Sequence, residues 1–282
     1  MKRSKLFGLI KSIALKVQSV LQQFGLSPVV LLSSVIAIPR YLKNYVKFSL
    51  QIKGLPSSFA RHPSAVRMGS IYPVLTDFGA SAGANSGHYY HQDLYIAKKI
   101  FSKRPDVHLD IGSRIDGFIA HLLAFGQRTV LGDVRPIISN DQNLSSICID
   151  LSSQLKVPIS QKYDSISSLH VVEHVGLGRY GDRIDPAGHI KAIHNLTSLL
   201  SHNGTLYLSF PIAKYSRIEF NAHRVLSLSE AKLIFDNLGL VIKDFVYVDD
   251  MGNLCCPDLP NGIDFSNTYG LKYGCGIWTL TY

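Results

Sequence analysis

The stretch VHLDIGSRIDGF, residues 107–118, has the pattern of a buried strand that runs into a glycine turn and then opens a helix. Gly112 stands at the turn and Gly117 at the start of the helix. Arg114 and Asp116 occupy positions where nucleotide-binding loops often carry further glycines. The stretch therefore predicts a strand–turn–helix unit of an α/β domain, with a ligand held at the turn.

Strand and helix patterns alternate along the chain around this unit. Strands are predicted at residues 107–111, 129–134, 146–149, 165–171, 205–210, 240–248 and 276–282. Helices are predicted at residues 88–101, 117–124, 187–200 and 229–237. Such alternation is typical of a parallel sheet covered by helices. We therefore expect a Rossmann-like α/β fold with a mostly parallel, seven-stranded sheet and helices on both faces.

The positive charge of the chain is concentrated at its N-terminus. Residues 1–54 hold nine Lys or Arg and no acid, which leaves 20 basic and 20 acidic residues in the rest. Apolar residues recur every three or four positions between these lysines, which predicts basic helices. Such helices either bind an anionic membrane surface or pack on the catalytic body, and the sequence leaves both open. We expect a basic helical extension over 1–54, a linker and cap helix over 55–105, and the main domain over 106–282.

Composition excludes several classes of protein. The chain is 46% hydrophobic, which is too much for a disordered protein, and its body is neutral, which does not favour nucleic acid as a substrate. No apolar run reaches the length of a spanning helix, and no signal-peptide cleavage site follows one. The four cysteines show no zinc-site spacing, so no metal is expected. A cytoplasmic protein, at most peripheral on the inner face of the plasma membrane, is the expectation.

The residues around the glycine turn distinguish between two cofactors. A dinucleotide places a diphosphate at the helix start, where the carboxylate of Asp116 would repel it. S-adenosylmethionine carries no phosphate, and Arg114 suits its carboxylate. Asp133, 21 residues after Gly112, suits the ribose hydroxyls, and Asp150 suits the adenine amino group. The pattern favours S-adenosylmethionine over a nicotinamide dinucleotide.

A family resemblance enters with the segment YDSISSLHVVEHVGLGRYGDRIDPAGHIKAIHNLTSLLSHNGTLYLSFP, residues 163–211. Its strand, EH pair, helix and HNGTLYLSFP turn resemble class I S-adenosylmethionine-dependent methyltransferases. Four blocks of the chain resemble more closely the family catalogued as domain of unknown function 268, which is common in bacterial gene sets for surface polysaccharides. The resemblance runs from about residue 56 to the C-terminus, and GLGRYGD is its most specific block. The four blocks are HYYHQD (88–93), HLDIGSRIDGF (108–118), SLHVVEHVGLGRYGDRIDP (168–186) and FNAHRVLS (220–227).

The resemblance implies a class I methyltransferase fold and assigns part of the cofactor site. Arg114 replaces the usual class I glycine, although it agrees with the narrower family. Leu169 and His170 fall on the strand end that lines the sulfonium, and Asp133 falls on the ribose position. The cofactor loop comprises Asp110, Gly112, Ser113 and Gly117.

Methyl transfer to a hydroxyl needs a base, since the acceptor loses a proton as it attacks. His170 and His174 follow the fourth predicted strand, and Glu173 can orient one of them or hold a metal. The alternative is that this EH pair caps the next helix. Nine further residues from the helix before the first strand, the GLGRYGD loop and the FNAHRVLS block are predicted to contact the acceptor. They are His88, Tyr89, Gln92, Asp93, Arg179, Tyr180, Asp185, His223 and Arg224.

The expected function is O-methylation of a sugar in a cell-surface polysaccharide or its precursor, with S-adenosyl-L-methionine as cofactor and a glycan or other small hydroxylated molecule as acceptor. One alternative is a non-catalytic, methyltransferase-like scaffold in a membrane-associated polysaccharide assembly. The replacement of a loop glycine by Arg114 and the basic N-terminus favour that scaffold. A nicotinamide-dependent enzyme is the third possibility, which Asp116 disfavours.

Overall fold

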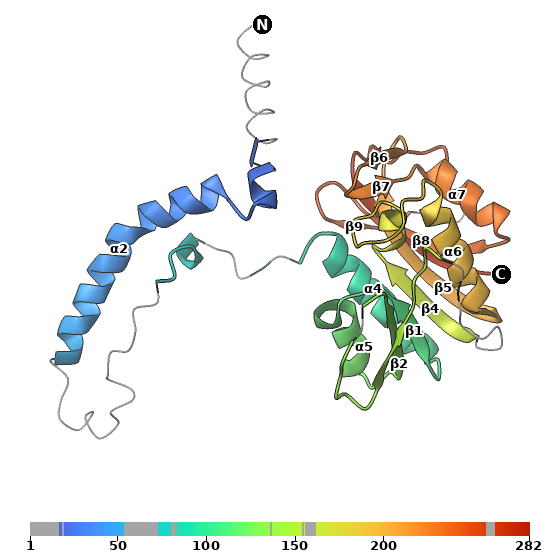
Figure 1. The fold of residues 1–282 in the computed structure, drawn as a ribbon, viewed down its shortest axis with the longest axis horizontal. Coiled ribbons are helices and arrows are strands. Elements are labelled where there is room, and N and C mark those ends of the chain that lie inside the picture. Colours follow the sequence, from blue (N-terminus) through green and yellow to red (C-terminus); the bar gives the residue numbers. More distant parts are fainter. Residues whose placement is uncertain are drawn as a thin grey trace, which may run out of the picture. The chain divides into compact units, whose positions relative to one another are not determined.

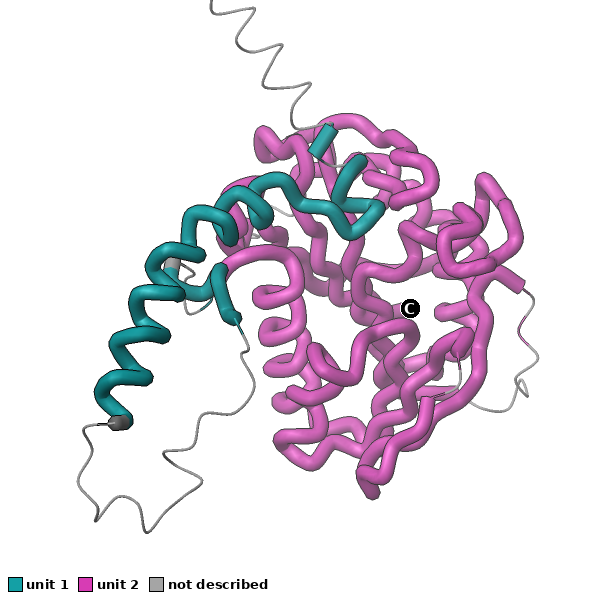
Figure 2. Tube along the Cα trace, turned by 60° about the vertical axis from the view of Figure 1, so that its left-hand side comes forward, with its two compact units in different colours: residues 1–84 teal, residues 85–282 magenta. Residues whose placement is uncertain are grey.

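The computed structural model describes residues 17–18, 20–53, 73–79, 83, 85–135, 137–153, 155, 162–257 and 263–282. The chain divides into two compact units, Met1–Ala84 and Asn85–Tyr282, which Figure 2 colours separately. The helix predicted at the extreme N-terminus lies almost wholly outside the described residues. The domain boundaries predicted after residues 54 and 105 stay predictions.

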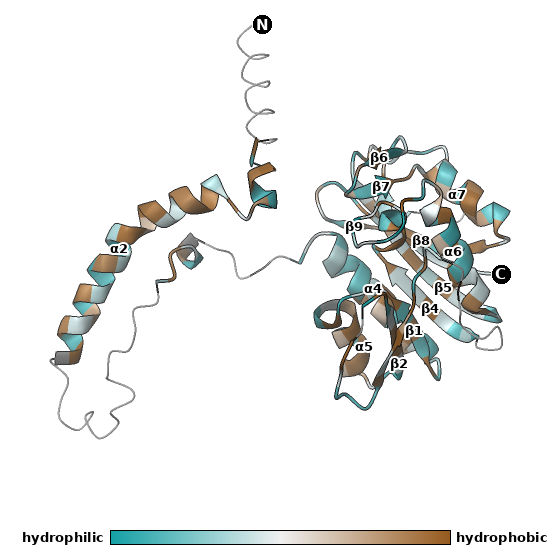
Figure 3. Cartoon of the chain, in the orientation of Figure 1, coloured by the Kyte–Doolittle hydropathy of each residue, from teal (hydrophilic) through white to brown (hydrophobic). Residues whose placement is uncertain are grey.

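The described part of the first unit includes a long helix, α2, at Pro28–Lys53, and a short 3-10 turn, η2, at Asp77–Gly79. Ser27 precedes α2, and its hydroxyl accepts a hydrogen bond from the Val30 backbone at 3.4 Å. Figure 3 shows apolar residues along much of the helix. Within the described part of the chain, no helix has the length and apolar character needed to cross a membrane.

The second unit is built on an eight-stranded sheet of order β3-β2-β1-β4-β5-β10-β8-β9 (Figure 1). The first five strands in this order run parallel, and β10 is antiparallel to both β5 and β8. The predicted Rossmann-like fold with a mostly parallel sheet is confirmed, except that the short β9 adds an eighth strand. The strands are β1 (His108–Ile111), β2 (Thr129–Asp133), β3 (Leu144–Cys148), β4 (Tyr163–Leu169), β5 (Leu200–Ile212), β8 (Val241–Val248), β9 (Leu254–Cys255) and β10 (Gly274–Thr281). A separate hairpin pairs β6 (Arg217–Glu219) with β7 (His223–Val225).

Two hydrophobic clusters lie on opposite faces of this sheet. One cluster packs apolar residues of α6 (Gly188–Leu199) and α7 (Leu228–Asn237) against the strands. The other uses α4 (His88–Lys103), the π-helical turn η3 (Ile115–Ile119) and α5 (Ala120–Ala124). Strands β5 and β10 are buried along most of their length, as expected of strands that are covered on both faces. Helices therefore cover both faces, as the alternating sequence pattern predicts.

The chain changes direction across the sheet between β1 and β4. From β1 it proceeds outward through β2 and β3, and it then returns to β4 and continues outward through β5 on the other side. Ligands of such sheets bind at the carboxyl ends of the strands that flank this switch point. The segments after β1 and β4 are therefore where a site is expected.

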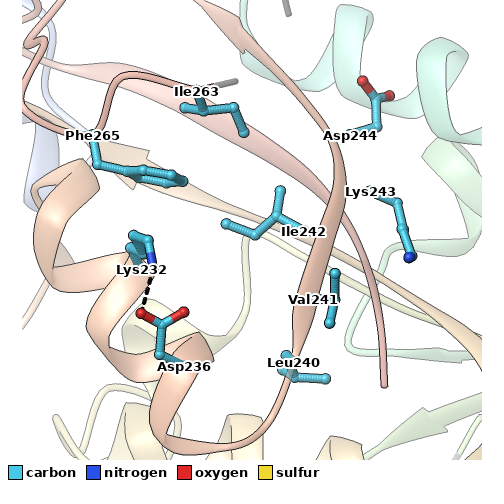
Figure 4. A pocket seen from close by; sticks show the side chains of 9 residues that line it. All are labelled: Lys232, Asp236, Leu240, Val241, Ile242, Lys243, Asp244, Ile263 and Phe265. Carbon is cyan, nitrogen blue, oxygen red and sulfur yellow. Dashed lines mark hydrogen bonds and ion pairs between the residues drawn. The ribbon is translucent and has the colours of Figure 1, made fainter. Parts of the chain in front are cut away.

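A groove of about 420 Å³ lies elsewhere, at the amino end of β8 (Figure 4). Lys232 and Asp236 of α7 form an ion pair at its side, and Phe265 lies across from them. Since β8 runs in the same direction as β5, this groove opens at the edge opposite the strand carboxyl ends. It is not part of the candidate site.

Candidate functional site

The turn after β1 is fixed from two sides. The Asp110 carboxylate is fully buried and accepts hydrogen bonds from the Ser113 backbone at 3.1 Å and the Ser113 hydroxyl at 3.0 Å. Gly112 has a φ of 87°, and a Cβ there would lie 2.6 Å from Val171 Cγ2. Only glycine suits this combination of backbone and contact. The predicted cofactor loop is thus packed directly against the segment that follows β4.

A buried polar chain supports the loop from below. Ser167 donates its hydroxyl hydrogen to the Asp110 carboxylate, so it accepts from His108 Nε2, which lies 2.8 Å away. His108 Nδ1 then accepts from Ser165 at 2.8 Å. Burial lowers the pKa of His108 to about 3 and raises that of Asp110 to about 7. Because each group has a defined partner, this chain holds Asp110 in one orientation.

Arg114 and Asp116 pair with each other across the loop. The Arg114 Nε and Nη2 lie 2.9 and 2.7 Å from the two Asp116 oxygens, and the side chains are 83% and 67% exposed. The pairing with a ligand carboxylate predicted for Arg114 stays a prediction. Arg114 also offsets the charge of Asp116, so the repulsion of a diphosphate expected from Asp116 is weaker than the sequence suggested. Gly117, inside η3, lies close to Asp93 of α4.

Asp133 ends β2, and Arg135 engages both of its oxygens. Arg135 Nε and Nη2 each lie 2.8 Å from the carboxylate, and these hydrogen bonds hold the pKa of Asp133 below its usual range. The Arg135 side chain is 70% exposed, whereas that of Asp133 is 7% exposed. A ribose at Asp133 would therefore have to displace Arg135. Asp150, beyond β3, is half-buried and accepts a hydrogen bond from the Ser152 backbone at 2.7 Å.

His170 follows β4 directly after the buried Leu169 and adopts a left-handed backbone conformation with φ 56°. Its Nδ1 lies 2.6 Å from Glu173 Oε1, and the two side chains are only 6% and 1% exposed. Burial lowers the pKa of His170, but the Cys275 sulfur and the Glu173 carboxylate outweigh it and raise that pKa well above 6.5. Among the described residues, none forms a hydrogen bond with His170 Nε2. A non-glycine residue in this conformation, with a buried unpaired nitrogen, is typical of a functional position.

His174 is held differently, in the short 3-10 turn η4 (Val172–His174). Its Nδ1 lies 2.6 Å from the Ala222 carbonyl, so this nitrogen carries the hydrogen and donates it. The other nitrogen, Nε2, lies 3.8 Å from Glu173 Oε1. Burial lowers the pKa of His174 despite the nearby Glu173 carboxylate. His174 is therefore a neutral imidazole at pH 7, with Nε2 available to accept a proton.

A continuous cluster of rings, which we call the ring cluster, surrounds these two histidines. His88 stacks on His170 with centroids 5.2 Å apart and an interplanar angle of 7°, and Tyr89 lies 5.2 Å from the same ring. Tyr273 links His88 to His223, and His223 leads on to His174 and Tyr180. The four corresponding centroid distances are 5.4 Å (His88–Tyr273), 5.2 Å (His223–Tyr273), 6.4 Å (His174–His223) and 5.7 Å (His174–Tyr180). The predicted catalytic histidines and four of the predicted substrate residues therefore lie together.

The other predicted substrate residues are engaged within the protein. Arg224 is 2% exposed, and its guanidinium donates to the backbone carbonyls of residues 173, 175, 185 and 186, so it fixes the loop between η4 and α6. Asp185 accepts from the Ala187 backbone at 2.9 Å and pairs with a lysine of α6. Gln92 and Asp93 are buried and bonded to each other at 3.1 Å. Arg179 donates to the Ala222 carbonyl at 3.0 Å.

Four residues that bear on the site do not appear in the sequence prediction. Tyr273 joins the ring cluster, and the fully buried Cys275 lies beside His170. Ser209 of β5 donates to Gln92 Oε1 at 2.6 Å, and Arg135 forms an ion pair with Asp133. A resemblance in local motifs does not identify such residues, because the sheet brings them together from distant parts of the chain. Arg135 alone offers a local signal, since it lies two residues after the acid it binds.

Part of the chain matches a known protein family. Residues 130–243 match the family described as "Caenorhabditis protein of unknown function, DUF268". No curated protein matches the chain.

Three solved structures illustrate the structural likeness. The Burkholderia thailandensis 1,6-didemethyltoxoflavin-N1-methyltransferase, with S-adenosylhomocysteine bound, is 15% identical, with a TM-score of 0.45 and coverage of 67% of this chain and 79% of that one. The N-methyltransferase NodS from Bradyrhizobium japonicum, in complex with S-adenosyl-l-homocysteine, is 13% identical (TM-score 0.42, coverage 69% and 87%). The [4+2]-cyclase SpnF is 12% identical (TM-score 0.46, coverage 72% and 89%). The resemblance to the DUF268 family is confirmed over residues 130–243.

Proposed function

We propose that this protein is an S-adenosylmethionine-dependent methyltransferase that transfers a methyl group to a hydroxyl of a sugar, in a cell-surface polysaccharide or its precursor. The observation that carries the proposal is the neutral His174 at the carboxyl end of β4, with a free Nε2. The segment that holds it packs on the glycine turn through Val171. A proton acceptor therefore lies on the segment in direct contact with the loop predicted to hold the cofactor.

The charged and polar side chains around the turn complement the charged and polar groups of S-adenosylmethionine. Arg114 and Asp116 offer one positive and one negative group at the loop, both exposed, for a ligand that carries a carboxylate and an ammonium. Asp133 offers two acceptor oxygens at the end of β2, where a ribose would present two hydroxyls. The Arg135 side chain is 70% exposed, so it can return to solvent when a ligand takes its place at Asp133.

The bound cofactor would supply an electrophilic methyl group, and the protein would supply position and a proton acceptor. In-line attack requires the acceptor oxygen to be held close to the methyl carbon with water excluded. His174 Nε2 takes the proton of the attacking hydroxyl, while the Ala222 carbonyl keeps the ring in the required tautomer. Glu173, 3.8 Å away, stabilises the imidazolium that forms. The oxygen–methyl bond thus replaces the sulfur–methyl bond, and the proton remains on His174 until it reaches solvent.

The exposed tyrosines of the ring cluster suit an acceptor that carries several hydroxyl groups. Tyr89 is 65% exposed and Tyr180 is 54% exposed, although each packs against a half-buried histidine on one side. Aromatic rings with polar hydroxyls present both an apolar face and a hydrogen-bonding tip. This combination suits a sugar, and the resemblance to a family from polysaccharide gene sets supports the same choice.

The test is methyl transfer from labelled S-adenosylmethionine to a panel of sugar nucleotides and surface-polysaccharide repeats, with and without His174→Ala. Loss of a general base reduces kcat by roughly 10²–10⁴-fold. The affinity for S-adenosylmethionine should stay unchanged. His202→Ala is the matched control, because His202 is exposed at the amino end of β5 and lies outside the site. Full activity of His174→Ala would exclude the proposed base, and cofactor binding without transfer to any acceptor would favour a scaffold.

We also propose that residues 1–54 bind an anionic membrane surface. Arg40, Lys43 and Lys47 of α2 recur at spacings of three and four and so share one face of the helix. Leu42, Val46 and other apolar residues of α2 are exposed. A helix that carries both basic and exposed apolar side chains can bind an anionic membrane surface.

A further inference from the structure

Three side chains that can bind a metal ion lie close together, namely those of His88, His170 and Cys275. A ring nitrogen of each histidine and the sulfur of Cys275 all lie within 4.8 Å of one another. They come from the start of α4, the end of β4 and the start of β10, so no local motif joins them. Tetrahedral zinc with two nitrogens and one sulfur requires separations of about 3.3–3.6 Å, which side-chain rotation can provide. We propose that these three residues form a Zn²⁺ site with an open fourth position.

The buried nitrogen of His170 supports the site independently of this proximity. Glu173 engages His170 Nδ1, which leaves Nε2 as the nitrogen free to bind an ion. Nε2 is buried in a side chain that is only 6% exposed, and it forms no hydrogen bond with the described residues. A buried nitrogen of this kind costs free energy unless a partner is supplied. A metal ion between His170 and Cys275 supplies that partner.

The surroundings of the three ligands match those of known metal sites. Metal-binding histidines usually donate their second ring hydrogen to a carboxylate or a backbone carbonyl. Here His170 lies against Glu173 at 2.6 Å, and the His88 ring forms a hydrogen bond with the backbone of Tyr273. Both histidines therefore have the outer contact that fixes ring orientation.

Cys275 is free to serve as the sulfur ligand. Its sulfur lies beside the His170 ring and also makes long contacts of 3.9 Å to Gln92 Oε1 and 3.7 Å to the Gly276 carbonyl, and it takes part in no disulfide. Binding releases to solvent the thiol proton and any proton carried by His170 Nε2, and the thiolate and the imidazole nitrogen each donate an electron pair without any change of oxidation state. The Cys275 thiolate and the Glu173 carboxylate, which contacts His170, together carry two negative charges that balance a divalent ion.

Zinc is the ion that this ligand set favours. Two imidazoles and one thiolate are borderline-to-soft donors, which suit Zn²⁺ and do not suit Mg²⁺ or Ca²⁺. Three protein ligands with a fourth position open are typical of catalytic rather than structural zinc. The open position would accept water or an oxygen of the acceptor. This use of the ion in methyl transfer rests on the proposed function, whereas zinc binding itself does not.

The experiment treats the full chain with a chelator and then titrates it with Co²⁺ alone, followed by Zn²⁺. We expect a sulfur-to-cobalt charge-transfer band at one ion per chain, which Zn²⁺ abolishes. Cys275→Ser should remove the band, and His88→Ala should weaken zinc at least tenfold in a competition with a chromogenic chelator. Glu173→Gln should weaken it by roughly 10–100-fold, as loss of an outer contact does.

Cys255→Ser and His91→Ala are the matched controls, because both residues are partly exposed and lie outside the three-ligand group. Both should bind zinc like the wild type. Absence of the band in the wild type, or its loss in Cys255→Ser but not in Cys275→Ser, would overturn the proposal. If Cys275→Ser does not fold, His88→Ala decides, and wild-type affinity in that variant overturns it. Zinc binding without any methyl transfer would refute the proposed function and leave the metal site standing.

Discussion

Gly112→Ala tests how closely the glycine turn approaches the segment after β4. The substitution places a Cβ 2.6 and 2.9 Å from the two Val171 methyl carbons, at a residue whose φ is 87°. The left-handed backbone costs roughly 1–2 kcal/mol for a residue with a side chain, and overpacking costs roughly 1–3 kcal/mol more. We therefore expect the free energy of unfolding to fall by about 2–5 kcal/mol, a large part of the stability of an ordinary domain.

A double-mutant cycle separates the contact from the backbone strain. Val171→Ala removes the methyl groups that the new Cβ would meet, so Gly112→Ala combined with Val171→Ala should be less destabilised than the sum of the single variants by about 1–3 kcal/mol. Urea unfolding measures this, with the fluorescence of the only tryptophan, the fully buried Trp278, as the signal. Additive single effects would refute the close approach of the two segments.

Three further predictions concern the cofactor, the base and the extension. Asp133→Ala should weaken the binding of S-adenosylmethionine by roughly 1.5–3 kcal/mol, the value of hydrogen bonds to a charged group. Arg135→Ala should instead tighten this binding by up to about fivefold, because it removes the competing ion pair. Isothermal titration of both variants checks this, and equal weakening in the two would contradict it. Because the pKa of His174 is lowered from 6.5, its ring is unprotonated at neutral pH. We therefore expect kcat to be constant near neutrality and to fall only as the pH drops below 6.5. A fall in kcat that already begins above pH 7 on acidification would speak against His174 as the base. Lys43→Glu combined with Lys47→Glu should reduce sedimentation with anionic vesicles at least tenfold, from about 1 kcal/mol per basic residue, with no change in cofactor affinity; vesicle binding that does not weaken with added salt would rule out the electrostatic account.

The sheet could be predicted from the sequence because most of its strands are short segments rich in apolar residues and bounded by turns. Strand β8, predicted at 240–248, is observed at Val241–Val248, and α7 begins where the hydroxyl of Ser227 accepts from the Glu230 backbone. The short β9 has only two residues, which is too little for any periodicity. Helix α2 begins at Pro28, and Ser27 followed by Pro28 is the helix-start pattern that marks it.

The sequence predicted those residues of the candidate site that have catalytic side chains and directly follow a strand. His170, Glu173 and His174 follow a strand directly, so their place at the sheet edge follows from the topology. Cys275 lies 105 residues beyond His170, and only the antiparallel insertion of β10 beside β5 brings the two together. The pairing of Arg135 with Asp133 depends on side-chain geometry, which periodicity does not specify.

Binding of S-adenosylmethionine tests the central claim most directly. Calorimetric titration of the full chain with S-adenosylmethionine, and separately with NAD, compares the two cofactors that fit a glycine turn of this kind. The proposed function predicts saturable binding of one S-adenosylmethionine per chain, weakened in Asp133→Ala, and no comparable binding of NAD. Saturable binding of NAD with no heat from S-adenosylmethionine would contradict it.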